Sequence, residues 1–183
     1  MIIDYNGLID RVSNNSRALI YGPLLKKYAV LSDINTPLRL AHFVAQIAHE
    51  STHFNFTREL WGDTPSQKQY EANKSLGNFA PGDGRRFLGR GLIQITGRFN
   101  TEEMLKQLNR DLTDYKYLES YEGAMQSACV WWQDRALNEL ADKSGTDVSF
   151  ITRKINGGYN GLKERKENFD KLMSYLAENC TND

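Results

Sequence analysis

The chain has 183 residues, of which 40% are hydrophobic and 11% aromatic, so it is long enough to bury one substantial core. Twenty-three basic and twenty-three acidic side chains give a formal net charge of zero, so the overall charge gives no reason to expect a nucleic acid or an anionic membrane as partner. Any electrostatic attraction of a ligand must be local. We expect one domain over residues 1–183.

The first residues do not resemble an export signal. Asp4 and Asp10 lie where such a signal needs a basic end and then an uninterrupted apolar run. No stretch approaches the roughly 18 apolar residues of a membrane-spanning helix. We therefore expect a cytoplasmic protein after synthesis, in which Cys129 and Cys180 are structural or incidental thiols.

Apolar residues recur at helical spacing in most of the chain, which predicts a mainly α architecture. Two N-terminal helices are expected on either side of the polar residues 13–16. Thr36 and Pro37 then supply a helix start, and a helix should run to about His49, with Glu50 at its C-terminal end. Further helical periodicity covers residues 102–108, 121–140, 148–155 and 162–177.

Residues 51–90 lose this periodicity and collect glycines, prolines and aromatic side chains. Unstructured connections of this length are uncommon in compact domains, so we expect an ordered binding arm. Two further aromatic residues, Trp131 and Trp132, follow helical core spacing. We expect at least one of them to pack in the core and not to bind a sugar.

The end of the Pro37 helix reads His49-Glu50-Ser51-Thr52-His53, which matches the zinc-peptidase pattern H-E-x-x-H. Such a site needs both histidines one turn apart on a continuous helix, together with a third ligand. The segment after Glu50 has weak helical preference, and nothing selects Glu59 or Glu71 as the third ligand. A zinc peptidase is therefore a remote alternative, which inactivation by a chelator would support.

Glu50 and Glu59 suggest a different chemistry. Inverting glycoside hydrolysis needs a protonated carboxyl group and, about 6.5–9.5 Å away, a carboxylate that activates a water. Glu50 ends an apolar helix, where partial burial and the negative helix end favour the protonated form. Glu59 lies in the loop TRELW, from which it could face Glu50 across a groove. Two glutamates alone are more often solvated surface charges, so the pair needs further support.

That support comes from FLGRGLIQITGRFN, residues 87–100. Three glycines permit close backbone approach, and Gln94, Thr96 and Asn100 would project from one face of an extended segment. Amides and hydroxyls both donate and accept hydrogen bonds, as sugar hydroxyls do. An ordinary strand with outward polar side chains is the alternative interpretation.

The segments AHFVAQIAHES, FLGRGLIQITGRFN and INGGYNGLKER occur in the order and approximate spacing of glycoside hydrolase family 19, the chitinase-like lysozymes. The chain resembles the short phage-endolysin type of that family over roughly Pro37 to Tyr175. The resemblance implies a mainly α, lysozyme-like fold with two lobes, a substrate cleft and a long loop or small irregular or β segment around residues 51–100. It also implies a single catalytic domain without a separate cell-wall-binding domain, and an inverting mechanism with no cofactor or metal.

The resemblance further implies roles for individual residues. Glu50 matches the general acid, Glu59 matches the general base, and Thr96 matches the residue that helps to hold the attacking water. The positions that match substrate-binding or supporting residues are Gln94, Asn100, Asn156 and Arg165.

We therefore expect an endolysin-type glycoside hydrolase that cleaves β-1,4 bonds of peptidoglycan glycan strands, as a lysozyme or muramidase does, and so lyses bacteria. The alternatives are a chitinase acting on β-1,4 N-acetylglucosamine polymers and a catalytically silent glycan-binding module, which a turbidity assay on cell walls would distinguish. An anionic polymer is favoured over neutral chitin because four arginines in residues 85–100 have no acidic neighbour in that window, namely Arg85, Arg86, Arg90 and Arg98.

The expected partner is thus the peptidoglycan strand, with no nucleic acid and no stable membrane insertion. The protein is expected to be monomeric. It should stay in the cytoplasm of the host bacterium until a separate membrane-permeabilising protein releases it to act on the cell wall.

Overall fold

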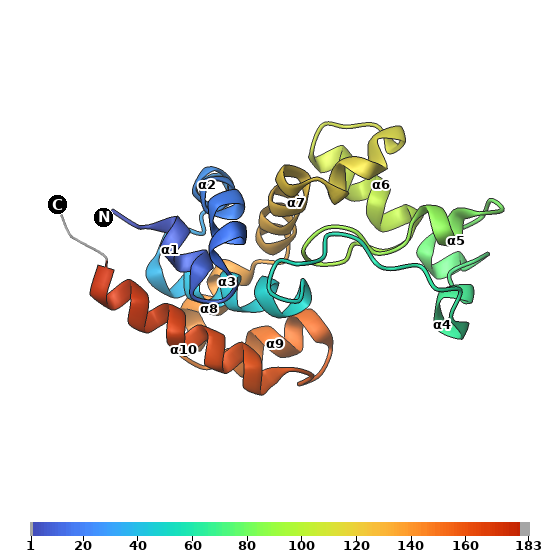
Figure 1. Cartoon of the computed structure of the whole chain (residues 1–183). Helices are drawn as coiled ribbons and strands as arrows, with labels where there is room; N and C mark the ends of the chain where they lie inside the picture. Colours follow the sequence, from blue (N-terminus) through green and yellow to red (C-terminus); the bar gives the residue numbers. More distant parts are fainter. Residues whose placement is uncertain (1, 180–183) are drawn as a thin grey trace. The chain divides into compact units, whose positions relative to one another are not determined.

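A computed structural model describes residues 2–179, and these residues form two compact units (Figure 1). Unit 1 contains the described residues up to Asn55 and those from Cys129 onward. Unit 2 contains Phe56–Ala128. Residues 2–55 and 129–179 therefore build one unit, and the middle of the chain builds the other.

Unit 1 is built around helix α3 (Pro37–Glu50), whose residues 40–48 are all buried. Thr36 caps this helix by accepting a hydrogen bond from the backbone N–H of Arg39, and Pro37 occupies its first turn. Helix α3 packs against α8, α9 and α10. The helices of this unit besides α3 are α1 (Tyr5–Asp10), α2 (Asn15–Leu31), α8 (Leu137–Ser144), α9 (Val148–Asn156) and α10 (Leu162–Asn179), together with the last residues of α7 (Tyr121–Asp134).

The core of unit 1 includes Trp132, which is 1% exposed and packs edge-on against Phe43. Its indole N–H donates to Asn138 Oδ1 at 2.9 Å, so the one polar atom of the ring is satisfied inside the core. Trp131 is half-buried, with the guanidinium of Arg135 over its ring. The expectation that at least one of the two tryptophans packs in the core is confirmed.

Unit 2 consists of short helical turns and loops. Its helices are α4 (Pro65–Lys68), η1 (Lys74–Leu76), α5 (Asp83–Arg86), α6 (Arg98–Gln107), η2 (Leu112–Glu119) and the first part of α7. Two isolated β-bridges, Arg58 with Arg90 and Arg90 with Ile95, join segments of this unit. The mainly α fold with an irregular middle segment is thereby confirmed.

The prediction of an extended segment over residues 87–100 is wrong. Arg90 and Ile95 exchange two backbone hydrogen bonds, of 3.0 and 2.7 Å, which close residues 91–94 into a turn. Gly91 and Gln94 have positive φ angles of 79° and 55°, so they reverse the chain direction. Asn100 belongs to the first turn of α6. The glycine spacing therefore marks a turn and a helix start, not one face of a strand.

Several expected helices are confirmed, including the two N-terminal helices and those starting at Pro37, Val148 and Leu162. The helix expected over residues 121–140 is instead two helices, because Ala136 adopts a φ of 52° between α7 and α8. No described helix has the length and apolar character needed to cross a membrane. Cys129 is a buried free thiol, and Cys180 lies outside the described residues.

Candidate functional site

In unit 1, Glu50 is held by Arg165. Glu50 is the last residue of α3, and Arg165 lies in the first turn of α10. Arg165 Nη2 donates to Glu50 Oε1 at 2.5 Å. The arginine is fully buried, whereas the Glu50 side chain is 23% exposed. The pair thus joins a buried cation to a carboxyl group that solvent can reach.

The buried end of Arg165 is also satisfied. Its Nη1 donates to Gln46 Oε1 at 2.5 Å, and Gln46 Nε2 donates to the hydroxyl of Thr152 at 3.2 Å. The Thr152 hydroxyl in turn donates to the carbonyl of Val148. A buried guanidinium is tolerated only when its donors are paired. This chain of bonds links α3, α9 and α10 and fixes the direction from which Arg165 approaches Glu50.

Glu164, next to Arg165, holds both histidines of the H-E-x-x-H pattern. His49 Nδ1 lies 2.7 Å from Glu164 Oε2, and His53 Nε2 lies 2.8 Å from Glu164 Oε1. The other ring nitrogen of His53 lies 2.7 Å from the carbonyl of Val12. The motif thus ties the end of α3 to α10 and to the chain after α1.

The arrangement around these histidines differs from that of a zinc peptidase. Helix α3 ends at Glu50, and residues 52–54 have φ angles of 51°, 58° and 64°. His49 and His53 therefore do not lie one turn apart on a continuous helix, as that site requires. Within residues 2–179, no three histidine, cysteine or acidic side chains are grouped so that they could hold a metal ion.

Gly161 completes the surroundings of His49. It has a φ of +70°, and a Cβ atom built on it would lie 2.1 Å from His49 Cε1. Only glycine combines this backbone conformation with the close approach of the imidazole ring. The turn before α10 is therefore shaped around the residue that precedes Glu50.

In unit 2, the carboxylate of Glu59 accepts hydrogen bonds on both oxygens. Gln67 Nε2 donates to Oε1 at 2.9 Å, and the backbone N–H of Gly89 donates to Oε2 at 3.0 Å. The N–H of Glu59 donates in return to the carbonyl of Gly89 at 2.9 Å. The pKa of Tyr70 is raised above its ordinary value, first by burial and then by the charge of Glu59 and a side-chain hydrogen bond with it. The Tyr70 hydroxyl therefore stays protonated beside this carboxylate.

Sequence reasoning missed the supporting residues Gln67 and Tyr70. Gln67 is buried and forms a capping box with Thr64 at the start of α4, while its side chain also donates to the carbonyl of Leu60. The signal was present in the sequence, because Thr64-Pro65-Ser66-Gln67 has the T-x-x-Q spacing of a capping box. Nothing in that spacing shows that the same amide reaches Glu59.

Thr96, Gln94 and Asn100 are brought together by local hydrogen bonds. The Thr96 hydroxyl donates to the carbonyl of Gln94 at 2.9 Å, and Asn100 Nδ2 donates to the carbonyl of Thr96 at 2.8 Å. The side chain of Gln94 lies against Gly89, since a Cβ atom there would approach its Oε1 to 2.6 Å. A Cβ at Gly89 would also lie 3.3 Å from Glu59 Oε2, so Gln94 and Glu59 are neighbours across this glycine.

Asn156 is the last residue of α9 and is exposed. Within the described residues, it takes no part in the hydrogen bonds that join Glu50, Arg165 and Gln46. Unit 1 thus brings Arg165 to Glu50, as the resemblance implied, but gives Asn156 no bond to that pair.

Two of the four arginines that have no acidic neighbour within residues 85–100 are paired with acidic side chains from outside that window. Arg90 is 3% exposed and pairs with Glu119 at 2.6 Å, and Arg98 pairs with Asp83 at 2.5 Å. Both acidic partners lie outside the sequence window, so the window did not show them. Arg85 and Arg86 are exposed.

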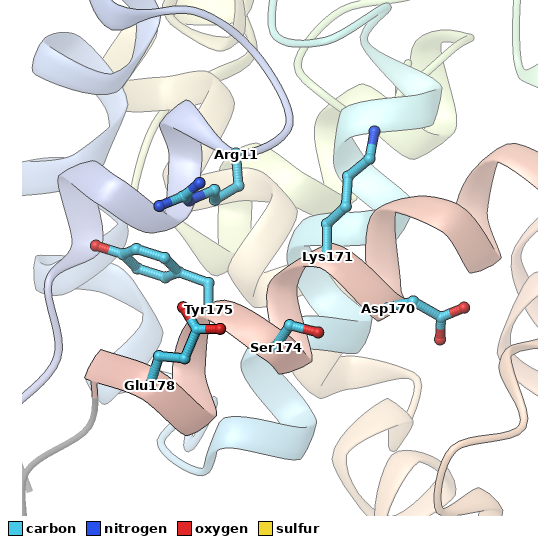
Figure 2. Close-up of a pocket in the computed structure, with 6 residues that line it drawn as sticks. All are labelled: Arg11, Asp170, Lys171, Ser174, Tyr175 and Glu178. Carbon is cyan, nitrogen blue, oxygen red and sulfur yellow. The ribbon is translucent and has the colours of Figure 1, made fainter.

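A separate pocket of unit 1 lies along α10 (Figure 2). The guanidinium of Arg11 lies 4.7 Å from the centroid of the Tyr175 ring, and Figure 2 shows the two side chains facing each other. Tyr175 follows Arg165 by ten residues, or about 15 Å of helix at 1.5 Å per residue. This pocket therefore belongs to the contact between α1 and α10 and not to the surroundings of Glu50.

Comparisons with known proteins agree with this description. No protein-family model matches the chain. A Haemophilus influenzae protein described as a glycosyl hydrolase family 19 domain-containing protein is 31% identical over an alignment of 163 residues, and the match covers 74% of this chain and 79% of that protein. Chitinase C from Streptomyces griseus has a similar structure, with a TM-score of 0.73, 17% identity and coverage of 95% of this chain and 92% of that one. A bacterial family 19 chitinase gives a TM-score of 0.66, 16% identity and coverage of 96% and 95%.

Proposed function

The chain belongs to glycosyl hydrolase family 19 and is a glycoside hydrolase with the mainly α, lysozyme-like fold, and on that premise we propose that it cleaves β-1,4 bonds in the glycan strands of peptidoglycan. We assign it an endolysin-type role in bacterial lysis. It would act as a monomer on the cell wall, after a separate membrane-permeabilising protein has released it from the host cytoplasm.

The observation that carries the choice of substrate is the local excess of positive charge beside Glu59. Arg58, the neighbour of Glu59, is half exposed, and Arg85 and Arg86 of the same unit are exposed as well. These charges are concentrated in a chain whose net charge is zero. Peptidoglycan carries carboxylates on its peptide stems, whereas chitin is neutral. An anionic glycan is therefore the better match for the surface that Arg58, Arg85 and Arg86 form.

Glu50 is the proposed general acid. Arg165 binds its Oε1, so Oε2 is the oxygen that would carry the proton to the leaving glycosidic oxygen. The buried chain behind Arg165 keeps this orientation fixed. Such preorganisation matters because a general acid must lie within hydrogen-bond reach of the oxygen that it protonates.

Glu59 is the proposed general base, with Thr96 as its partner in holding water. Each carboxylate oxygen has two acceptor sites, so Glu59 can accept from a water while Gln67 and Gly89 hold it in place. The Thr96 hydroxyl donates to the carbonyl of Gln94, so its lone pairs remain free to accept the second hydrogen of that water. Attack by this water opposite the leaving group inverts the anomeric carbon.

Chitin is the alternative substrate, and a specific observation favours it. The two solved structures compared above are both named as chitinases. Chitin has the same β-1,4 linkage and the same acetamido groups as the peptidoglycan glycan, so the bond-breaking groups would act identically on it. The two proposals differ only in what the substrate carries beside the glycan.

The test compares purified peptidoglycan sacculi with colloidal chitin, using the wild-type protein and Glu50→Gln. We expect new reducing ends from sacculi and a fall in turbidity of cell walls. Glu50→Gln keeps the shape of the side chain but removes the proton donor, so it should lower the rate by about 10²–10⁴-fold. Cleavage of chitin without cleavage of sacculi would replace the proposed substrate, and a folded Glu50→Gln protein with more than about a tenth of the wild-type rate would remove Glu50 from the acid role.

A further inference from the structure

Unit 2 contains a basic pocket of about 450 Å³. The name basic pocket refers to the side chains of Arg58, Arg85, Arg86, Arg90 and Lys116 around the ring of Tyr115, with Glu119 as the acidic lining residue. Since the chain as a whole is neutral, five cations around one pocket are a marked local concentration of charge.

The charges of the basic pocket are only partly balanced. Glu119 pairs with Arg90 at 2.6 Å and lies 3.6 Å from Arg58. Within residues 2–179, no acidic side chain lies within ion-pair distance of the three remaining cations, which are Arg85, Arg86 and Lys116. These three side chains belong to exposed residues. The pocket therefore has positive charge available for a ligand.

Part of the pocket is rigid. Arg90 is buried, and its Nη1 donates to the carbonyl of Leu88 while its Nε donates to Glu119. The guanidinium groups of Arg86 and Arg90 lie 5.1 and 4.8 Å from the centroid of the Tyr115 ring. Contact with an aromatic ring restricts a guanidinium without neutralising it. Arg86 is thereby held in place while its N–H groups remain able to bind an anion.

The basic pocket is adjacent to the proposed base but faces another way. Arg58 and Glu59 are consecutive residues at the bridge that pairs Arg58 with Arg90. In such extended backbone, successive side chains point to opposite sides. Accordingly, Glu59 contacts Gln67 and Gly89, whereas Arg58 approaches Glu119. The pocket is thus placed to receive a group attached to the glycan, not the sugar ring whose bond is cleaved.

We propose that the basic pocket binds the carboxylates of the peptide stems that peptidoglycan carries on its muramic acid residues. Guanidinium groups match carboxylates in geometry and can bind them through paired hydrogen bonds. The inference rests on the proposed function, because chitin carries no such group. It assigns the choice between the two glycans to Arg85, Arg86 and Lys116, which lie outside the bond-breaking groups.

The experiment measures binding by isothermal titration calorimetry at low salt, using full-length Glu50→Gln protein so that the ligand stays intact. The ligands are soluble peptidoglycan fragments with their peptide stems and the same fragments after an amidase has removed the stems. Arg85→Ala/Arg86→Ala should weaken binding of the stem-bearing fragments by about threefold to tenfold, as expected for two lost exposed ion pairs. It should not change binding of the stem-free fragments. The matched control, Lys74→Ala/Lys106→Ala, removes two exposed charges of unit 2 that lie outside the pocket.

Equal binding of stem-bearing fragments by Arg85→Ala/Arg86→Ala and by the control, with both proteins shown to be folded by circular dichroism, would overturn the inference. The inference would also be overturned by a phosphate polymer that displaces the fragments from the basic pocket and binds there more tightly than they do. The pocket would then be a phosphate-binding site. Failure of the proposed function would be recognised by a different result. In that case the wild-type protein releases no reducing ends from sacculi, whatever the pocket binds.

Discussion

At the scale of single residues, the two glutamates are held in different ways. A buried guanidinium contacts one oxygen of Glu50, while neutral donors from Gln67 and Gly89 contact both oxygens of Glu59. Neutral donors orient a carboxylate without cancelling its charge, which suits a base that must attract a proton from water. In the proposed mechanism, the fixed cation at one oxygen of Glu50 leaves the other oxygen to face the leaving group.

Thr96 tests the proposed water site. Thr96→Val keeps the shape of the side chain but removes the hydroxyl that would accept a hydrogen of the water. We expect kcat on a soluble oligosaccharide to fall about tenfold, the equivalent of one neutral hydrogen bond. Glu59→Gln should cost more, about 10²–10⁴-fold, because it removes the base itself.

The same assay reports stereochemistry when the products are followed by proton NMR. An inverting enzyme produces the α-anomer first from a β-linked substrate. An initial β-anomer would remove Glu59 from the base role and leave Thr96 without its water. A Thr96→Val protein that loses as much activity as Glu59→Gln would also contradict the roles given to the two side chains.

Sequence and resemblance predicted Glu50, Glu59 and Arg165 as site residues, and the structure joins two of these three within unit 1. The residues that hold them were not predictable in the same way. Gln67 lies eight residues from Glu59, and Glu164 lies 115 residues from His49. Hydrogen bonds between such positions depend on how loops fold back, which local periodicity does not record.

At the scale of elements, the turn between α9 and α10 is fitted to the end of α3. Gly161 and Gly157 both have positive φ, of 70° and 77°, but only Gly161 contacts His49. Gly161→Ala and Gly157→Ala should each be destabilised by a backbone strain of about 1–2 kcal/mol, because each places an alanine at a positive φ. Gly161→Ala should lose roughly 1–3 kcal/mol more in the free energy of unfolding, because its methyl group overlaps the imidazole ring.

Urea unfolding of the two variants measures this difference, and activity assays on the same proteins give a second readout. Displacement of His49 should also disturb Glu50, so Gly161→Ala is expected to lose more activity than Gly157→Ala. Equal stability of the two variants would show that the segment relaxes without cost and that the close approach to His49 is not required.

The contact between α1 and α10 makes stability depend on pH. A hydrogen bond from the backbone N–H of Gly7, and then one from the Tyr175 hydroxyl, hold the pKa of Asp4 below its ordinary value of 3.8. Because the folded protein binds this proton more weakly than the unfolded chain, Asp4 stabilises the fold above about pH 4. The contribution is lost as the pH falls through the lower folded pKa.

We therefore expect Asp4→Asn to melt at a lower temperature than the wild-type protein at pH 7, and the difference to shrink at pH 3. Asp10→Asn, which changes an exposed aspartate of the same helix, is the matched control. A difference between wild type and Asp4→Asn that stays constant or grows on acidification would contradict this assignment.

The long helices were predictable because their apolar residues repeat at the helical period over many turns. The middle of the chain was not, because side-chain to backbone bonds hold its short helical turns. Glu71, for example, accepts hydrogen bonds from the N–H groups of Gly82 and Gly84 and so fixes the start of α5. A glycine-rich sequence indicates that the chain turns here, but not which side chain each turn is folded around.

At the scale of the whole molecule, the sequence predicted a mainly α protein and the resemblance predicted its fold. Neither showed that residues 2–55 and 129–179 form one unit while residues 56–128 form another. The net charge of zero was also uninformative about local charge. It argued against a long-range electrostatic attraction by the whole chain, but it did not reveal the basic pocket of unit 2. Under the proposed function, the charges that would distinguish peptidoglycan from chitin are thus local and depend on the folded structure.

The most direct test of the proposed function is the chemistry of the new chain ends. Purified peptidoglycan is digested, the fragments are reduced with borohydride, and their ends are identified by mass spectrometry, with Glu50→Gln as the control for contaminating activity. We predict reduced muramic acid ends that are absent from the Glu50→Gln digest, as expected for cleavage on the muramic acid side of the β-1,4 linkage. Reduced glucosamine ends would contradict that bond, and a digest without new reduced ends would contradict peptidoglycan as the substrate.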